Sequence, residues 1–127
     1  MNERRLRILW IDDPFRCKTI ETYWNIAREG QIDLKVATST EEALEKLSQS
    51  FDVLVCHIKY DENKVASYAN RRHENILTIG ISGGGLSDYM VKPLGYDLFV
   101  EQTMLRSSFC GVDDALVMRG LLENVRE

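Results

Sequence analysis

The stretch Phe51-Asp-Val-Leu-Val-Cys-His-Ile-Lys59 decides how the rest of the chain is interpreted. Its apolar run from Val53 to Cys56 contains β-branched residues, and His57 follows directly where the run ends. A short apolar run bounded by polar residues is typical of a strand buried on both faces of a parallel sheet. Ligands bind just outside the carboxyl ends of the strands in such sheets. We therefore expect His57 and Lys59 to lie where a functional site would form.

Strand patterns and helix patterns alternate on both sides of this stretch. Pro14 suits the first position of a helix, and Ser39-Thr-Glu-Glu42 is a capping box that opens another. The expected strands are 6–11, 32–36, 51–57, 76–81 and 89–91, and the expected helices are 14–29, 40–47, 62–72 and 113–125. Such alternation predicts an α/β fold with right-handed connections. We expect the flavodoxin-like arrangement, a three-layer α/β/α fold with a five-stranded parallel sheet in the order 2-1-3-4-5.

Length and composition indicate one ordinary globular domain spanning residues 1–127. Of these 127 residues, 44% are hydrophobic and 28% are charged. The net charge of −4, without a basic run, argues against nucleic acid as a partner, and no apolar run is long enough to span a bilayer. The N-terminus has no secretory signal pattern and the three cysteines are widely spaced, so we expect a cytoplasmic protein with free thiols.

Polar residues follow several of the expected strands. In the predicted strand order the first and third strands are neighbours, so Asp12, Asp13 and His57 would converge at one edge of the sheet. Ser82 and Lys92 would lie next to them, because each follows a later strand. These five residues form our candidate site.

This set of positions resembles the receiver domain of bacterial response regulators, the CheY-like family. Three short motifs of that family appear in the right order: an acidic pair after the first strand, a hydroxyl residue after the fourth, and a lysine-proline pair after the fifth. They are Asp12-Asp13, Ser82 and Lys92-Pro93. Residues 37–44 also resemble the start of the family's second helix, and the resemblance covers roughly residues 6 to 93.

One departure from the family decides the chemistry. The resemblance implies an aspartate at the end of the third strand that accepts a phosphoryl group, with the hydroxyl and the lysine contacting the phosphate. Here that position holds His57. An imidazole cannot form an acyl phosphate, so the chain is similar to an atypical receiver, or pseudoreceiver. Phosphohistidine at His57 is the chemical alternative.

The resemblance also implies that Asp12 and Asp13 hold Mg²⁺. The alternative is an acidic pair that only caps a helix, because the helix dipole favours acidic residues at its N-terminus. Loss of the third carboxylate removes one oxygen ligand from the ion. Adjacent carboxylates repel, and His57, Lys59 or Lys92 would relieve that repulsion as an internal cation. We expect no cofactor, with Mg²⁺ at Asp12 and Asp13 as the alternative.

The second half of the chain departs further from the family. Only residues 83–88 connect the fourth strand to Tyr89–Val91, so we expect the fourth helix to be missing or replaced by a loop. We expect the strand at 89–91 to run parallel, with an antiparallel return as the alternative. Residues 94–111 are interpreted as an atypical insertion, either a helix or a strand, that covers the sheet or forms a dimer surface.

Three functions follow from these observations. The first is a non-enzymatic module of signal transduction that binds a protein partner, or a second copy of itself, without phosphorylation. The second is a small-ligand or anion sensor that uses the candidate site. The third is an enzyme with His57 as base or nucleophile, which is disfavoured because no serine or cysteine occupies a nucleophile elbow.

Overall fold

The computed structural model describes residues 5–27, 30–58, 65–72, 75–82, 95–101 and 105–121. In chain order the elements are β1 (Leu6–Ile11), α1 (Pro14–Ala27), β2 (Ile32–Ala37), α2 (Thr40–Lys46), β3 (Val53–His57), α3 (Val65–Arg72), β4 (Leu77–Ser82), β5 (Leu98–Glu101) and α5 (Leu105–Met118).

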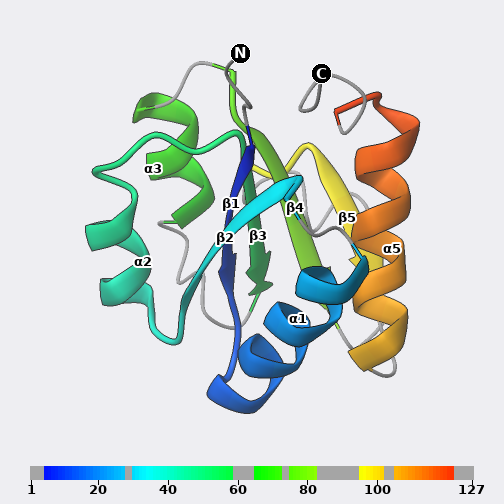
Figure 1. Cartoon of the computed structure of the whole chain (residues 1–127). Coiled ribbons are helices and arrows are strands. Elements are labelled where there is room, and N and C mark those ends of the chain that lie inside the picture. The colour runs from blue at the N-terminus through cyan, green and yellow to red at the C-terminus, as the bar shows by residue number, and fades with distance from the viewer. Residues whose placement is uncertain are drawn as a thin grey trace.

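The five strands form one parallel sheet in the order β2-β1-β3-β4-β5. Figure 1 shows α1 and α5 together on one face of this sheet, with α2 and α3 on the other. The predicted flavodoxin-like architecture and its 2-1-3-4-5 strand order are therefore confirmed.

Each face of the sheet carries its own hydrophobic core, because successive side chains of a strand point to opposite faces. Trp10 and Val55 pack in the cluster beneath α1 and α5, whereas Leu54 and Cys56 pack in the cluster beneath α2 and α3. Val53 to Cys56 are all completely buried. Because β3 is buried on both faces of the sheet, the prediction that its apolar run forms a central strand is confirmed.

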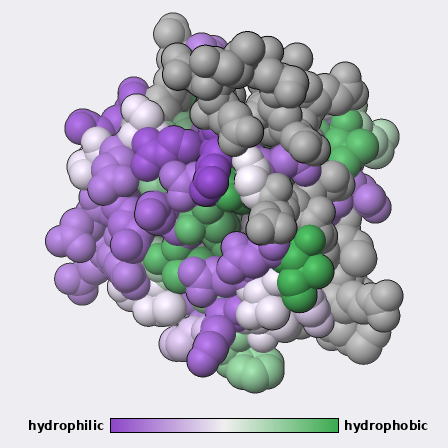
Figure 2. Space-filling view, in the orientation of Figure 1, coloured by the Kyte–Doolittle hydropathy of each residue, from purple (hydrophilic) through white to green (hydrophobic). Residues whose placement is uncertain are grey.

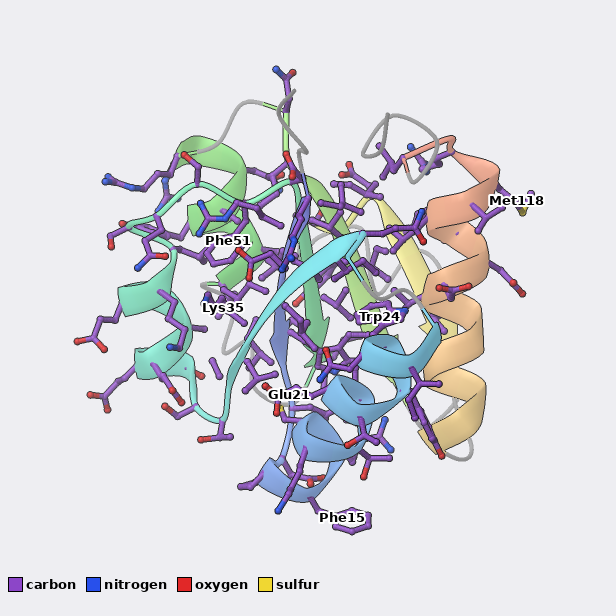
Figure 3. All side chains as sticks on the ribbon, viewed as in Figure 1. Phe15, Glu21, Trp24, Lys35, Phe51 and Met118 are labelled. Atoms are coloured by element: carbon purple, nitrogen blue, oxygen red, sulfur yellow. The ribbon has the colours of Figure 1, made fainter. Side chains whose placement is uncertain are left out.

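Trp24 connects α1 to α5 within the first of these cores. Its ring meets that of Trp10 edge to face, with centroids 5.5 Å apart, an arrangement that aromatic pairs favour. The Trp24 indole Nε1 donates a hydrogen bond to Asp113 Oδ1 on α5 at 3.1 Å. Figure 3 shows Trp24 on the side of α1 that faces α5. The contact joins two helices that are far apart in the sequence.

The predicted capping box is confirmed at the start of α2. Ser39 Oγ accepts a hydrogen bond from the Glu42 backbone N–H at 3.1 Å. The Glu42 carboxylate reaches back to the Thr38 N–H at 2.8 Å, one residue before the position that a standard capping box uses. The start of α1 at Pro14 is confirmed as well.

The position of the fifth strand is a correction. The strand that pairs with β4 is Leu98–Glu101, which runs parallel to it. The stretch expected as the fifth strand, Tyr89–Val91, lies outside the described residues. Just before β5, Thr78 and Asp97 exchange hydrogen bonds, among them Thr78 N to Asp97 Oδ2 and Asp97 N to Thr78 Oγ1, both at 3.0 Å. These contacts fix the register of β5 on β4. Lys92-Pro93 therefore precedes the fifth strand instead of following it.

The described part of 94–111 consists of regular elements of the fold, and the strand alternative for this stretch holds at Leu98–Glu101. That range contains β5 and the first half of the last helix, which begins at Leu105 instead of near residue 113 and ends at Met118. Gly111 has low helix propensity, but its small size allows α5 to approach β5. A methyl group added there would lie 2.7 Å from Val100 Cγ1. The predicted absence of a fourth helix concerns residues 83–94, which lie outside the described residues.

Among the described residues, the large apolar side chains that are exposed lie on α1 and α5. Figure 2 shows hydrophilic side chains over α2 and β2. Phe15, Ile26 and Met118 are 75%, 78% and 87% exposed, and Figure 3 shows Phe15 and Met118 pointing away from the body of the molecule. Within the described residues, no helix is both long enough and apolar enough to cross a membrane.

We predict that Asp113→Ala lowers the free energy of unfolding by about 1–2 kcal/mol, because it leaves the buried Trp24 indole N–H without this acceptor. Urea denaturation measures the change. The exposed neighbour Asp114 is the matched control, and Asp114→Ala should change stability by less than about 0.5 kcal/mol. Equal effects of the two substitutions would contradict the proposed role of the Trp24 contact.

Candidate functional site

The structure brings the backbone of most of the predicted site to the carboxyl edge of the sheet. Asp12 and Asp13 directly follow β1, and His57 and Ser82 end β3 and β4. The register pairs Ile11 with Cys56, so the end of β1 lies beside the end of β3. Lys59 and Lys92 lie outside the described residues. Lys92 was assigned to this edge because of the expected strand at 89–91, and the position of β5 removes that reason.

Asp12 is a fully buried carboxylate, and both of its oxygens are engaged. Oδ1 accepts a hydrogen bond from the Asp13 backbone N–H at 2.8 Å. Oδ2 accepts one from the Trp10 indole Nε1 at 3.3 Å and one from Arg16 Nε at 2.9 Å. A buried carboxylate needs such partners, because loss of water otherwise makes its charge costly.

Arg16 supplies the positive charge beside Asp12. Their salt bridge joins residues four apart, and the side chains of Arg16 and Asp12 are 14% and 1% exposed. An internal cation was predicted, but it was assigned to His57, Lys59 or Lys92, and Arg16 was missed. The sequence spacing could have identified Arg16 as the cation. Arg16 lies in the first turn of α1, four residues after Asp12, and residues four apart at a helix start can contact each other.

Asp13 acts as the N-cap of α1. Its Oδ1 accepts a hydrogen bond from the Arg16 backbone N–H at 2.9 Å, and Pro14 occupies the first helical position. This is the standard way in which an aspartate satisfies a free N–H at a helix start. The helix-capping interpretation of the acidic pair therefore holds for Asp13, through one carboxylate oxygen. Asp12 instead forms an ion pair with Arg16.

Cys17 lies next to the backbone of Asp12, and it is 2% exposed. Its Sγ lies 3.5 Å from the Asp12 carbonyl oxygen and 3.6 Å from that of Ala37. Burial raises the pKa of the Cys17 thiol from 9.0 to about 12, and the negative charge of Asp12 adds to the rise. Cys17 is therefore a protonated thiol that donates to the backbone, and it is neither a nucleophile nor a thiolate ligand at neutral pH.

His57 is the last residue of β3 and is half-buried. The alternation of β3 places it on the same face of the sheet as Val53 and Val55, under α1 and α5. Cys56 belongs to the opposite core, so the two neighbours do not face a common ion. Ser82 is paired with Glu101 in the register of β4 and β5.

This donor set does not fit a divalent cation well. Mg²⁺ prefers oxygen ligands and is usually held by one or two carboxylates. Here both Asp12 oxygens already accept hydrogen bonds, one Asp13 oxygen caps α1, and His57 replaces the third carboxylate that the resemblance implies. Among the residues that the structure describes, no group of three or more His, Cys, Asp or Glu side chains is placed to hold a metal.

We predict that Arg16→Ala lowers the free energy of unfolding by about 3 kcal/mol, because it leaves the buried Asp12 carboxylate without its counter-charge. Lys18→Ala is the matched control, since Lys18 is an exposed basic residue on the same helix. It should change stability by less than about 0.5 kcal/mol. Chemical denaturation of both variants measures the difference, and a loss below about 1 kcal/mol in Arg16→Ala would show that the pair is weakly coupled.

The Cys17 thiol predicts a specific pH dependence. An unfolded thiol ionises above pH 9.0, while the folded one keeps its proton until about pH 12. Its contribution to stability is therefore fully present below pH 9 and is lost as the pH rises towards 12. Between pH 8 and pH 10, wild type should lose about 1 kcal/mol more stability than Cys17→Ala, which cannot ionise. Parallel pH profiles of the two proteins would contradict this assignment.

No family model matches the chain, and no curated protein matches it in sequence. Its fold is similar to several solved receiver structures. A CheY-like response regulator receiver domain protein from Methanospirillum hungatei has a TM-score of 0.71 and 16% identity, over 90% of this chain and 95% of that one. The chemotaxis response regulator CheY4 of Vibrio cholerae has a TM-score of 0.70 and 11% identity, over 88% and 99%.

A third similar structure is a complex with Mg²⁺ and BeF. The response regulator TrrA from Thermotoga maritima, in complex with Mg²⁺ and BeF, has a TM-score of 0.68 and 18% identity, over 89% of this chain and 97% of that one. At such identities the similarity establishes architecture. The chain has the fold of response-regulator receiver domains.

Proposed function

We propose that this chain is an atypical receiver, or pseudoreceiver, that acts in signal transduction by binding a protein partner without phosphorylation. The observation that carries the proposal is the buried ion pair between Asp12 and Arg16, whose Nε lies 2.9 Å from Asp12 Oδ2. We further propose that the protein works in the cytoplasm and has no catalytic activity of its own.

The ion pair replaces the charge that a metal would supply. In a receiver that uses Mg²⁺, the resemblance assigns the ion to the acidic pair. Here the Arg16 guanidinium already balances Asp12, and an incoming cation would have to displace a buried, hydrogen-bonded partner. Breaking such a pair costs several kcal/mol, since it leaves a charge without its partner in the interior. Metal binding therefore starts with a penalty that an open carboxylate site does not have.

The residues at the ends of β3 and β5 support the same proposal. His57 has no carboxylate that could form an acyl phosphate. β5 ends in Glu101, followed by Gln102 and Thr103, where the resemblance implies a lysine that contacts the phosphate. The sequence therefore has neither an acceptor carboxylate at the end of β3 nor a lysine directly after β5, and both differences oppose phosphorylation.

The apolar side chains exposed on α1 and α5 support a protein partner. Phe15 and Ile26 are eleven residues apart, about three helical turns, so they lie on the same side of α1. Met118 is exposed on the neighbouring α5. These are three large apolar side chains exposed on the two helices of one layer, and a partner that covered this layer would remove them from water. A signalling partner or a second copy of this chain would cover them, and a homodimer remains part of the proposal.

The alternative function, a small-ligand or anion sensor at the candidate site, has less support. It requires open polar groups at Asp12, Asp13, His57, Ser82 and Lys92. Asp12 is engaged within the protein, and the reason for placing Lys92 at this edge is gone. The Asp13 carboxylate at this edge would repel an anion.

We predict that incubation with Mg²⁺ and acetyl phosphate, a small phosphodonor, leaves the intact mass of the protein unchanged. The physical reason is the absence of an acceptor carboxylate at position 57 and the neutralised charge of Asp12. Mass spectrometry measures the phosphorylated fraction, and a receiver domain that keeps the acceptor aspartate shows that the donor is active.

His57→Ala is the matched control for the chemical alternative. A phosphoryl adduct that appears on wild type, is lost in acid and is absent from His57→Ala would identify phosphohistidine and contradict the proposal. An adduct on an aspartate of wild type that hydroxylamine cleaves, as it cleaves an acyl phosphate, would contradict it equally.

A further inference from the structure

An open pocket lies at the opposite edge of the sheet from Asp12. Its volume is about 570 Å³, and the described residues that line it are Ser48, Ser50, Tyr68, Arg71 and Arg72. The two serines precede β3, and the other three residues belong to the second half of α3. The pocket therefore lies where strands begin, between the C-terminal ends of α2 and α3. Its volume is within the range of pockets that hold small molecules.

The lining side chains are donors without partners inside the described part of the chain. None of the five carries a carboxylate, and Arg71 and Arg72 make no ion pair among the described residues. In contrast, Arg7 and Arg16 each face an aspartate. Two guanidinium groups and three hydroxyls in one hollow are a set of groups that favours an anion.

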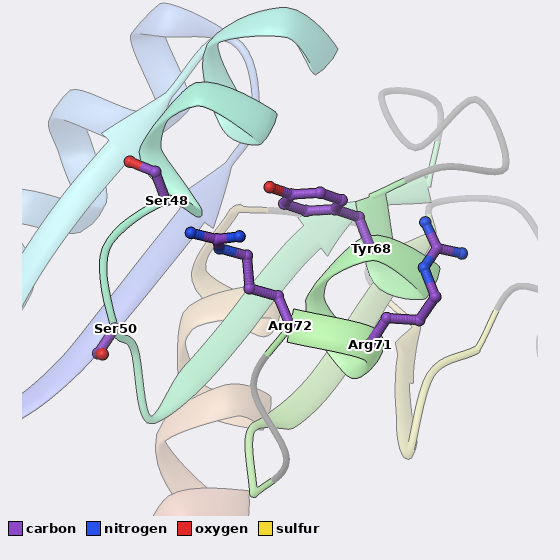
Figure 4. Close-up of a pocket in the computed structure, with 5 residues that line it drawn as sticks. All are labelled: Ser48, Ser50, Tyr68, Arg71 and Arg72. Atoms are coloured by element: carbon purple, nitrogen blue, oxygen red, sulfur yellow. The ribbon is translucent and has the colours of Figure 1, made fainter.

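Figure 4 shows how these groups are arranged. The Arg72 guanidinium reaches towards Ser48, and the Tyr68 hydroxyl points to the same side of the pocket. The Arg71 guanidinium lies beyond the backbone end of Tyr68, away from Arg72 and Ser48. The ring itself is held in place, because Tyr68 packs against the core beneath α2 and α3. A ligand could therefore place an anionic group at Arg72 and lay its remaining atoms against Tyr68.

The helix dipoles oppose an anion here, but the arginines outweigh them. The C-terminal end of a helix carries roughly half a negative charge. Two such ends, from α2 and α3, amount to about one negative charge at most, whereas Arg71 and Arg72 contribute two full positive charges. The two arginines therefore exceed the two helix ends in charge.

We propose that this pocket binds a small molecule that carries a phosphate group, held by Arg72, the Tyr68 hydroxyl and Ser48, with Arg71 adding charge. Phosphate suits these groups because a guanidinium can donate to two of its oxygens at once. The site is separate from the Asp12 edge, so it does not depend on whether that edge binds a metal or accepts a phosphoryl group.

Phenyl phosphate is the probe, and amide NMR at constant ionic strength is the measurement. We expect saturable shifts at Ser48, Ser50 and Tyr68, and at least about tenfold weaker binding in Arg72→Gln, which loses charge-assisted hydrogen bonds. Arg119→Gln is the matched control: it removes the same charge from an exposed arginine at the C-terminal end of α5. Its affinity should stay within about twofold of wild type. The indole signals of both tryptophans show whether each variant is folded.

Three results would overturn the proposal. The first is an absence of saturable shifts in the pocket up to about 10 mM phenyl phosphate. The second is equal weakening in Arg72→Gln and Arg119→Gln, which would indicate general charge attraction. The third is a phosphoserine peptide that binds more tightly than phenyl phosphate, which would assign the pocket to a protein partner instead of a small molecule.

Discussion

The buried pair of Asp12 and Arg16 is the interaction on which the functional edge depends. It fastens the end of β1 to the first turn of α1, and the same Asp12 oxygen receives the Trp10 indole N–H. Trp10 packs on Trp24, and Trp24 is bonded to Asp113 of α5. The charge at the sheet edge and the packing of the α1–α5 layer are thus parts of one network, in which each polar group has a partner.

This network also sets the charge balance at the edge of the sheet. At the edge of the sheet that carries the candidate site, the charge of Asp12 is balanced by Arg16, a side chain of the chain itself. Because Arg16 is part of the chain, its charge stays beside Asp12 at any ion concentration. The two positive charges without internal partners among the described residues of α3 lie at the other edge of the sheet.

The sequence was sufficient for elements whose local pattern and burial agree. The run Val53–Cys56 predicted the central strand, and Pro14 and Ser39 predicted two helix starts. It was insufficient for β5, because Tyr89–Val91 and Leu98–Glu101 have similar short apolar patterns. Pairing with β4 decides between them, and that information is not local. A lysine-proline pair is too short a motif to make this choice.

The sequence predicted the position of the candidate site but missed its cation. Strand order placed Asp12, Asp13, His57 and Ser82 at one edge correctly, because carboxyl ends of parallel strands meet there. The cation was predicted at the ends of other strands. The structure shows that it is Arg16, which lies in the first turn of α1, the helix that follows Asp12. The contact between Asp12 and Arg16 could be predicted from the sequence only by assuming that Asp12 is buried and therefore needs a nearby cation.

The most direct test is an amide NMR titration with Mg²⁺, followed by beryllofluoride. The chain has two tryptophans, so the indole region holds one signal next to Asp12, from Trp10, and one next to Asp113, from Trp24. If Arg16 already balances Asp12, neither signal should move at millimolar Mg²⁺, and beryllofluoride should add nothing. A saturable shift of the Trp10 indole and of the Asp12 and Asp13 amides, with Trp24 unchanged, would contradict the account.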